Sequence, residues 1–388
     1  MLFSSLLLVF LAGEVSASYR DLGIPASSAT VEVRVFNVQN ATLIDEAHAF
    51  IKPVLPGHEN APFPDYAFLV DHQDSKKRTR RILFDLGFRK DVLNYAPAIV
   101  PFFTSGGVQI ESLDKDIIDL LHDGGIPLDS IDAVVWSHTH FDHIACFHCS
   151  IEGDMSKFPN TTRLVIGSET DTSTYPSFPN ASLQESDFAG REVGLLMFAT
   201  ANLTFSGLKA IDYFGDGSFY LLDTPGHLAG HLSALTRVTP TSFVSLGADT
   251  FHYVGQMRPR PALQRNFPCP GHLVEEAKEY ISTDYFWSPE SRDGAFGLHS
   301  RSQQLLGVSD TPDAFYADPV TAAVSVDKLA SFDADPDIFV VISHDISLRT
   351  AIPYFPASLN DWKAKQLKTK TVWSFLDKTN PAFVFSPM

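Results

Sequence analysis

The chain has 388 residues, of which 44% are hydrophobic, and its 29 basic and 46 acidic residues give a net charge of −17. This length and apolar content predict a globular protein with a sizeable core. Nucleic-acid binding depends on a basic surface, so the acidic balance argues against a polyanionic partner. The largest basic run, KKRTRR at 76–81, lies between two apolar runs and is predicted to form the exposed tip of a hairpin.

The first 17 residues, MLFSSLLLVFLAGEVSA, are typical of a secretory signal peptide. They hold an apolar core and end in small residues, so cleavage is expected before Ser18. No later apolar run reaches the roughly 20 residues that a membrane span needs, so no membrane association is expected. We therefore expect a secreted glycoprotein, with a cytoplasmic protein as the alternative. Four N-glycosylation sequons fit the secretory route, at Asn40, Asn160, Asn180 and Asn202.

The chain has three cysteines, Cys146, Cys149 and Cys269, which are too few for a disulfide framework. Cys146 and Cys149 form a C-x-x-C pair that fits a disulfide, a redox pair or a metal knuckle. Either of them could instead pair with Cys269. Every one of these pairings leaves one thiol over.

In chain order, strand and helix patterns follow one another without a repeat or a low-complexity linker, so one domain is expected over residues 18–388. Period-two alternation and short apolar runs predict strands at 31–38, 66–70, 81–87 and 132–137. Helical spacing predicts helices at 111–123, 272–282, 325–332 and 358–376. This mixture predicts an α/β layer architecture.

The segment HTHFDH (138–143) directly follows the predicted strand at 132–137 and is rich in metal-ligand residue types. At this chain's own residue frequencies, three histidines and one aspartate at these offsets arise by chance about once in a thousand chains. Imidazole nitrogens and carboxylate oxygens suit zinc. Four ligands from one short loop cannot all surround a single tetrahedral ion that keeps a position open, so the pattern favours two ions. A hydrogen-bonded structural cluster is the alternative.

Three further ligand-type residues follow apolar runs elsewhere in the chain. His227 comes after FYLLDTPG, Asp249 after SFVSLGA, and His344 after DIFVVIS. In α/β sheets, sites are built at the carboxyl ends of strands. We therefore expect these side chains to lie close to the HTHFDH segment.

Together, H-x-H-x-D-H, TPGH, G-x-D and the late histidine resemble the metallo-β-lactamase superfamily, and LFDLG at 83–87 resembles its early Asp-Gly turn. The resemblance covers most of the chain from residue 31 to the tail. It implies an αββα four-layer sandwich with a dinuclear metal site at the strand ends. One metal would be held by His138, His140 and His227, the other by Asp142, His143 and His344, with Asp249 as the bridge and His231 behind the ligands.

The resemblance also bears on the metal and the reaction. Oxygen-reducing diiron members of the superfamily commonly carry Glu in place of the second histidine of the motif, whereas His140 is intact. Two Zn²⁺ ions are therefore expected, while Mn, Fe and Co fit the same residue types. The implied reaction is hydrolysis by a hydroxide that two zinc ions share. Asp142 or Asp249 would steer the proton. His252, or its neighbour Tyr253, would donate it to the leaving atom, unless His252 is only a loop residue beside the metals.

The substrate class follows from the branch of the superfamily. The PGHE loop around His58, the segment ADTFHY (248–253) and the triplet SHD (343–345) are similar to lactonase-like members, including acyl-homoserine lactonases. We expect a small, neutral or apolar lactone. The alternatives are a lactam, thioester or aryl ester at the same site, and a non-catalytic metal-binding protein. The aromatic segment at 284–316 would either cover the pocket or pack in the core. Without a basic surface or pocket, a nuclease and a glyoxalase-type hydrolase are less favoured.

Overall fold

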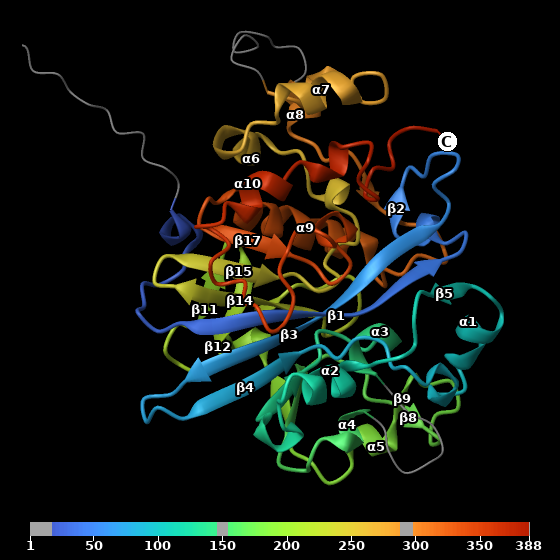
Figure 1. The fold of residues 1–388 in the computed structure, drawn as a ribbon, viewed down its shortest axis with the longest axis vertical. Coiled ribbons are helices and arrows are strands. Elements are labelled where there is room, and N and C mark those ends of the chain that lie inside the picture. Colours follow the sequence, from blue (N-terminus) through green and yellow to red (C-terminus); the bar gives the residue numbers. More distant parts are fainter. Residues whose placement is uncertain (1–17, 146–153, 288–297, 388) are drawn as a thin grey trace, which may run out of the picture.

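The computed structural model describes residues 18–145, 154–287 and 298–387. The expected signal peptide, Cys146 and Cys149 lie outside these residues. Cys269 forms no disulfide within the described part of the chain. Two β-sheets face each other and helices cover their outer faces, so the expected αββα four-layer sandwich is confirmed (Figure 1). In Figure 1 the layers run from α9 through the smaller sheet and the larger sheet to α2.

The larger sheet has seven strands, in the spatial order β10 (Val193–Leu196), β7 (Arg163–Gly167), β6 (Ala133–Val135), β4 (Thr79–Phe84), β3 (Ala61–Gln73), β1 (Val31–Leu43) and β5 (Val108–Ile110). The smaller sheet has six strands, in the order β11 (Leu203–Phe205), β12 (Leu208–Asp212), β13 (Phe219–Asp223), β14 (Leu232–Thr239), β15 (Ser242–Leu246) and β17 (Ile338–Val341). Two short ribbons pair β2 (Ile51–Lys52) with β16 (Gly307–Val308) and β8 (Thr174–Tyr175) with β9 (Leu183–Gln184).

The α-helices are short except for one. They are α1 (Val100–Thr104), α2 (Ile117–Asp123), α3 (Phe141–Ile144), α4 (Asp154–Lys157), α5 (Glu185–Phe188), α6 (Pro261–Asn266), α7 (Gly271–Ala277), α8 (Leu298–Arg301), α9 (Pro319–Ala334) and α10 (Leu367–Thr371).

Side-chain alternation along the strands divides the core into layers. Val33 of β1 and Leu221 of β13 belong to one apolar cluster, which fills the space between the two sheets. Leu222, the residue after Leu221 in β13, and Leu83 of β4 belong to a second apolar cluster. This cluster also contains Leu121 of α2 and Leu329 of α9. Both faces of each sheet are therefore buried, as expected when sheets carry helices outside and another sheet inside.

Strand direction brings several carboxyl ends to one edge of the sandwich. In the larger sheet β4 and β6 run parallel. In the smaller sheet β13 and β15 are each antiparallel to β14, and β17 is parallel to β15, so β13, β15 and β17 share one direction. The segments after these strands can therefore meet at one place.

Two of the predicted helices were wrong in extent. The helix predicted at 111–123 begins only at Ile117, because the side chain of Asp116 caps it by accepting hydrogen bonds from the backbone N–H groups of Ile118 and Asp119. Leu113, which was expected on the buried helical face, is instead 39% exposed. The helix predicted at 272–282 corresponds to α7 and ends at Ala277. The prediction at 325–332 falls inside the longer helix α9.

The tail helix predicted at 358–376 was largely wrong, since this range contains only the short α-helix α10 and a 3-10 turn at Ser374–Leu376. Asn360 accepts a hydrogen bond from the Val33 N–H at 2.9 Å and donates one to the Val31 carbonyl at 2.7 Å. Leu359 N–H donates to the Val33 carbonyl. Hydrogen bonds to the edge of β1 opposite β3 therefore replace the bonds that a helix would make within itself.

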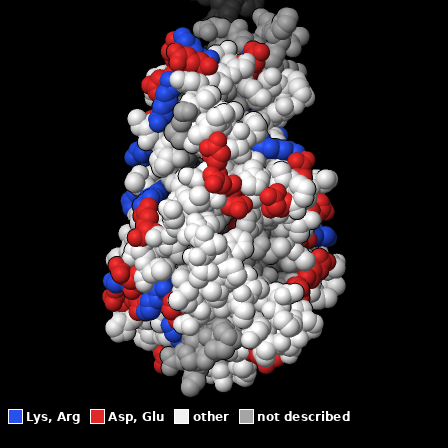
Figure 2. Space-filling view, turned by 90° about the vertical axis from the view of Figure 1, so that its right-hand side faces the viewer, with Lys and Arg blue, Asp and Glu red and all other residues white. Residues whose placement is uncertain are grey.

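The hairpin tip predicted at KKRTRR is confirmed in part: Lys76, Lys77 and Arg78 are exposed between β3 and β4, whereas Thr79, Arg80 and Arg81 begin β4 and both arginines are half-buried. Acidic and basic side chains are interspersed on the face shown in Figure 2, and a broad part of that face carries neither. Within the described residues, no helix combines the length and the apolar content that a membrane crossing needs.

Candidate metal centre

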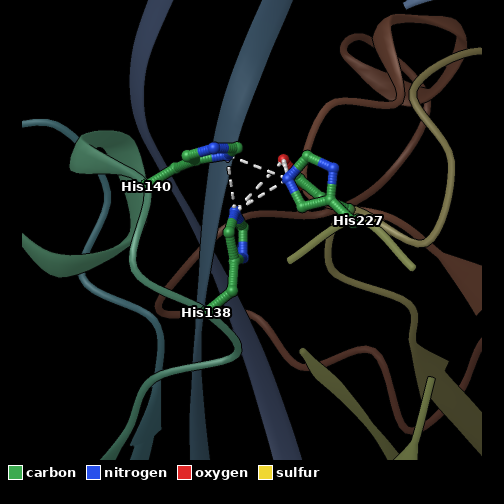
Figure 3. A group of neighbouring side chains, drawn as sticks. His138, His140 and His227 are labelled. Atoms are coloured by element: carbon green, nitrogen blue, oxygen red, sulfur yellow. Dashed lines mark hydrogen bonds and ion pairs between the residues drawn. The ribbon is translucent and has the colours of Figure 1, made fainter. Parts of the chain in front are cut away.

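The HTHFDH segment begins at His138, just after Trp136 and Ser137 follow the end of β6, and it turns directly into α3. Three ring nitrogens converge in front of it: His138 Nε2 lies 3.1 Å from His140 Nδ1 and 3.1 Å from His227 Nε2, and the last two atoms lie 2.9 Å apart. Figure 3 shows the three rings pointing these nitrogens toward a common point. His138 and His227 are buried, and His140 is half-buried.

His227 reaches this point through a tight loop after β13. Its neighbour Gly226 has φ +123°, and a Cβ atom there would lie 2.1 Å from the backbone nitrogen of Ala322 in α9. The backbone N–H groups of Ala317 and Asp318 donate to the carbonyls of His227 and Gly226. Only glycine fits this close approach, so the start of α9 fixes where His227 lies.

A second set of donors lies beside the first. His344 Nε2 lies 3.4 Å from Asp142 Oδ2, and His143 Nε2 lies 4.0 Å from the same oxygen. Asp142 and His143 come from the first turn of α3, whereas His344 follows β17. All three are buried.

Asp249 lies between the two sets and gives one carboxylate oxygen to each. Oδ2 lies 3.6 Å from His138 Nε2 and 3.5 Å from His227 Nε2. Oδ1 lies 3.3 Å from His143 Nε2 and 3.2 Å from His344 Nε2. The structure therefore brings all seven predicted ligand residues together.

The donor geometry fits transition-metal ions. At the 2.0–2.1 Å bond lengths of zinc to nitrogen, tetrahedral donors lie about 3.3–3.4 Å apart. The distances within the first set run from 2.9 to 3.6 Å and bracket this value. His143 Nε2 and Asp249 Oδ1 are buried without a hydrogen-bond partner among the described residues. Burying such atoms unpaired is costly, and a cation held between them would remove that cost.

The electrostatics of the two sets differ. Burial lowers the pKa of His138 and His227 well below the usual value and lowers that of His140 to about 4, so these rings are neutral, as metal ligands must be. Burial also acts to lower the pKa of His143 and His344. The facing carboxylates, Asp249 foremost, outweigh it, raising the pKa of His143 well above its ordinary value and that of His344 to about 9.

Three of the five candidate ligand histidines have their other ring nitrogen held by a hydrogen bond, whereas His227 Nδ1 is buried without a hydrogen-bond partner among the described residues. His143 Nδ1 lies 2.9 Å from Asp85 Oδ2, His138 Nδ1 lies 2.9 Å from Ser137 Oγ, and His344 Nδ1 donates to the Pro64 carbonyl at 3.0 Å. Such contacts fix the orientation and tautomer of a ligand ring. Asp85 is the aspartate of the LFDLG turn, and its other oxygen accepts the Ser137 N–H at 2.7 Å.

His231 contacts this assembly from behind. Asp249 N–H donates to His231 Nε2 at 3.2 Å, and His231 Nδ1 donates to the Thr224 carbonyl at 2.8 Å. The structure thus places His231 as a hydrogen-bond partner of the Asp249 backbone.

His252 and Tyr253 lie beside Asp249. His252 Nε2 lies 3.1 Å from Asp249 Oδ2, and its Nδ1 lies 2.7 Å from the Tyr316 hydroxyl. Tyr253 is buried, and its hydroxyl has no hydrogen-bond partner among the described residues. His58 lies elsewhere, with Nε2 2.6 Å from the Ser386 carbonyl oxygen near the C-terminus.

A cavity of about 480 Å³, including its opening to solvent, leads to the cluster. Its lining combines a group of metal-ligand-type side chains with a larger group of mostly apolar ones, and its described lining contains no Lys or Arg. The first group is formed by His140, Asp142, Asp249, His252 and His344, and the second, which we call the apolar wall, by Leu43, Phe50, Ala61, Pro62, Phe63, Phe141, Tyr253 and Phe315.

The sequence identified only part of this wall. Of the aromatic segment at 284–316, Phe315 lines the cavity, whereas Phe286 packs against Trp373. Phe50 and Phe63 were not predicted, although Phe63 lies in the strand that contains the predicted run at 66–70. Phe50 stacks on Phe315 with 4.9 Å between ring centroids, a contact between segments far apart in the chain.

The sequence was compared with known proteins, and no protein-family model matches it. It is 35% identical over 385 residues to metallo-hydrolase mfmC of Annulohypoxylon moriforme, covering 93% of this chain and 90% of that protein. It is 32% identical over 377 residues to gamma-lactamase FDB1 of Fusarium pseudograminearum, covering 92% of this chain and 84% of that protein.

A third relative is much longer. The chain is 36% identical over 365 residues to cytochrome P450 monooxygenase mpaDE of Penicillium brevicompactum, and the match covers 91% of this chain but spans only 38% of that protein. Among solved structures, an N-acyl homoserine lactone hydrolase superposes with a TM-score of 0.52 at 15% identity, covering 86% of this chain and 99% of that one.

Relatives that match nearly end to end, the αββα fold and the His/Asp cluster at its edge all point to one family. The chain belongs to the metallo-β-lactamase superfamily.

Proposed function

We propose that the chain is a dinuclear, metal-dependent hydrolase that opens the ring of a small, neutral cyclic ester. The observation that carries this proposal is the division of the Asp249 carboxylate, with Oδ2 facing His138 and His227 and Oδ1 facing His143 and His344. A carboxylate placed between two sets of donors is suited to bridge two cations.

In this proposal, His138, His140 and His227 hold one ion, Asp142, His143 and His344 hold the other, and Asp249 bridges them. Zinc is our first choice because the donors are imidazole and carboxylate, and Mn, Fe or Co would suit the same donors. When bound, two such ions supply a hydroxide near neutral pH and polarise the carbonyl group of the substrate.

The chain's own residues would orient the substrate and move protons. Asp142 and Asp249 line the cavity beside the proposed ions and would accept the proton of the attacking water. His252 lines the same cavity, with Nε2 3.1 Å from Asp249 Oδ2. It would donate its Nε2 proton to the leaving oxygen and take up the proton that Asp249 accepted from the water, so that the ring ends neutral. The apolar wall around Phe50 and Phe315 would exclude water and bind the body of the substrate.

The cavity lining favours a neutral substrate. Without Lys or Arg in the described lining, a substrate carboxylate would find no guanidinium or ammonium group to pair with, and the cavity itself carries Asp142 and Asp249. This disfavours substrates that must be held by a carboxylate, such as glutathione thioesters.

A cyclic amide is the second candidate, favoured by the relative named gamma-lactamase FDB1. A lactam places nitrogen where a lactone places oxygen, so the same site would need the same proton at its leaving atom. A thioester or aryl ester remains a weaker alternative, and a metal-binding protein without catalysis remains a minor one.

The experiment is a substrate panel with the purified full chain supplied with zinc. Neutral γ-lactones, γ-lactams, aryl esters and thioesters are compared by the release of acid and by the ring-opened product. We expect ring opening of the lactones, and a lactam preference would select the second candidate. No turnover of any cyclic substrate would contradict the proposal.

Three variants test the residue roles in this panel. Asp249→Ala should abolish turnover and lower the metal content to at most one ion per chain, whereas Asp361→Asn, at an exposed aspartate, should change neither. His252→Phe should lower kcat by about 100-fold while metal content is kept. Unchanged kcat in His252→Phe would exclude the donor role.

We also propose that residues 18–388 act as one secreted domain after removal of residues 1–17. Of the four sequons, Asn160, Asn180 and Asn202 are exposed, while Asn40 is half-buried in β1. Secreted protein from a fungal or yeast host should lose mass on treatment with an N-glycosidase, and its N-terminus should be Ser18. A mature chain that retains residue 1 would contradict this.

A further inference from the structure

One buried amide, that of Gln256, ties together three segments around the cluster. Its Oε1 accepts the backbone N–H groups of His252 and Tyr253 at 2.8 and 2.9 Å. Its Nε2 donates to the Phe50 carbonyl at 2.9 Å and to the Tyr316 hydroxyl oxygen at 3.2 Å. Backbone N–H groups can only donate and a carbonyl can only accept, so these partners fix which end of the amide is oxygen.

The orientation of Gln256 determines the hydrogen bond that Tyr316 makes. Because the Tyr316 oxygen already accepts from Gln256 Nε2, its own hydrogen is free for the other neighbour, His252 Nδ1 at 2.7 Å. Tyr316 is 3% exposed and Gln256 is 1% exposed, so water has little access to compete for these groups.

The contact at the other ring nitrogen of His252, Nε2, favours the same tautomer as the contact with Tyr316. His252 Nε2 lies 3.1 Å from Asp249 Oδ2, and a carboxylate oxygen can only accept. A ring with hydrogen on Nδ1 would set a nitrogen lone pair against that oxygen, whereas a ring with hydrogen on Nε2 makes a hydrogen bond at each end. Both contacts therefore select the Nε2–H tautomer.

We propose that Gln256 and Tyr316 are positioning residues that keep the hydrogen of His252 on Nε2, where it faces Asp249 and the cavity. This inference rests on the proposed function, since it explains how His252 presents a proton at the cavity end of its ring. Tyr316 acts through His252 and does not line the cavity in the described structure.

The same segment reaches the first set of metal-ligand candidates. The Tyr316 ring packs edge-on against His227 at 5.4 Å between centroids, and the next residue, Ala317, donates its N–H to the His227 carbonyl at 2.8 Å. Residues 316–317 therefore contact both His252 and His227. A substitution that displaces residues 316–317 could therefore also displace His227. The test must distinguish the loss of the Tyr316 hydroxyl from such a displacement.

The direct test reads the tautomer of His252 by nitrogen NMR of the full chain, as purified and again after zinc is added. The His252→Phe variant assigns the signal. We expect hydrogen on Nε2 and a lone pair on Nδ1 in the unmodified protein. Tyr316→Phe should raise the fraction of the Nδ1–H form, because only the Asp249 contact then selects Nε2–H. Gln256→Glu should favour Nδ1–H, because the new carboxylate would take the Tyr316 hydrogen and leave its oxygen to accept from His252.

A ring protonated on Nδ1 alone or on both nitrogens in the unmodified protein would overturn the inference. So would a tautomer that both substitutions leave unchanged. Tyr316→Phe alone decides the matter if the buried carboxylate of Gln256→Glu prevents folding. Because the tautomer is read without substrate, this result stands apart from the substrate panel, and either proposal can fail while the other holds.

Kinetics give a second readout through a double-mutant cycle. Tyr316→Phe should lower kcat about tenfold with metal content unchanged. In the His252→Phe background the same change should alter kcat less than about twofold. An equal loss in both backgrounds would mean that Tyr316 acts only on the fold. Tyr220→Phe is the matched control, because Tyr220 is equally buried but packs against Phe205 in β11, outside the cluster.

Discussion

His143 donates from Nδ1 to Asp85 Oδ2 across 2.9 Å, and both side chains are fully buried. The bond leaves His143 Nε2 directed at the second set of donors, beside Asp249 Oδ1. Asp85 therefore orients the ring that would bind the proposed second ion. Asp85 itself is not among the residues that line the cavity.

The Asp85→Asn variant should bind the second metal ion about 10–100-fold more weakly, because partners of this kind orient the ligand ring and raise its basicity. Affinity is measured by titration of chelator-treated protein with zinc. Asp361→Asn serves as the control, since its carboxylate is exposed. Equal affinities in the two variants would show that Asp85 does not support the ligand.

Metal affinity should rise with pH between 7 and 9. In the metal-free chain burial lowers the pKa of His344, but Asp249 and Asp142 outweigh it and raise that pKa to about 9. Below that pH the ring carries a proton that the metal must displace, so affinity increases by up to about tenfold per pH unit for each proton displaced. Calorimetry in buffers of different ionisation heats counts these protons. Binding at pH 7 without proton release would contradict the assignment of His344.

Gly226→Ala should destabilise the fold by about 3 kcal/mol or more, since the new methyl group meets the backbone of Ala322 in α9 and the residue has positive φ. Gly215→Ala is the control: φ there is +75°, but nothing lies within 4 Å of the added atom. It should cost only about 1 kcal/mol. The two variants are compared by denaturant unfolding, and equal losses would mean that the close approach at Gly226 is not constraining.

Asn360→Ala should lower the free energy of unfolding by about 2 kcal/mol, because it leaves the Val33 N–H and the Val31 carbonyl without their side-chain partner. Asp361→Asn, the next residue, again provides an exposed control. If chemical denaturation found no difference between the two variants, the tail would owe its position on β1 to apolar packing alone.

The sequence was most informative where the chemistry is local. His138, His140, Asp142 and His143 lie in one turn after a short strand, and three more candidates follow apolar runs, so fold and cluster could both be anticipated from the printed chain. The helix predicted at 358–376 did not form in full, because residues of this tail make hydrogen bonds to a strand far away in the sequence. The side chain of Asn360 accepts the hydrogen bond of the Val33 N–H in β1. Gln366, just before α10, has a left-handed backbone conformation with φ 55°.

The cavity wall and the residues behind His252 could not be read from local patterns. Tyr316 lies 64 positions from His252, and Gln256 joins segments more than 200 positions apart by reaching Phe50. Such contacts exist only once the sheets have packed. Asp85 was visible as a turn residue, but its partner His143 was not, since they are separated by 58 positions and meet only because β4 and β6 are parallel neighbours.

The central claim is that seven side chains hold two transition-metal ions, and elemental analysis of the purified, folded chain tests it most directly. We predict two ions per chain in the unmodified protein, with Asp249→Ala retaining at most one. A folded chain that contains no stoichiometric transition metal, and that takes up none when zinc is supplied, would contradict the account.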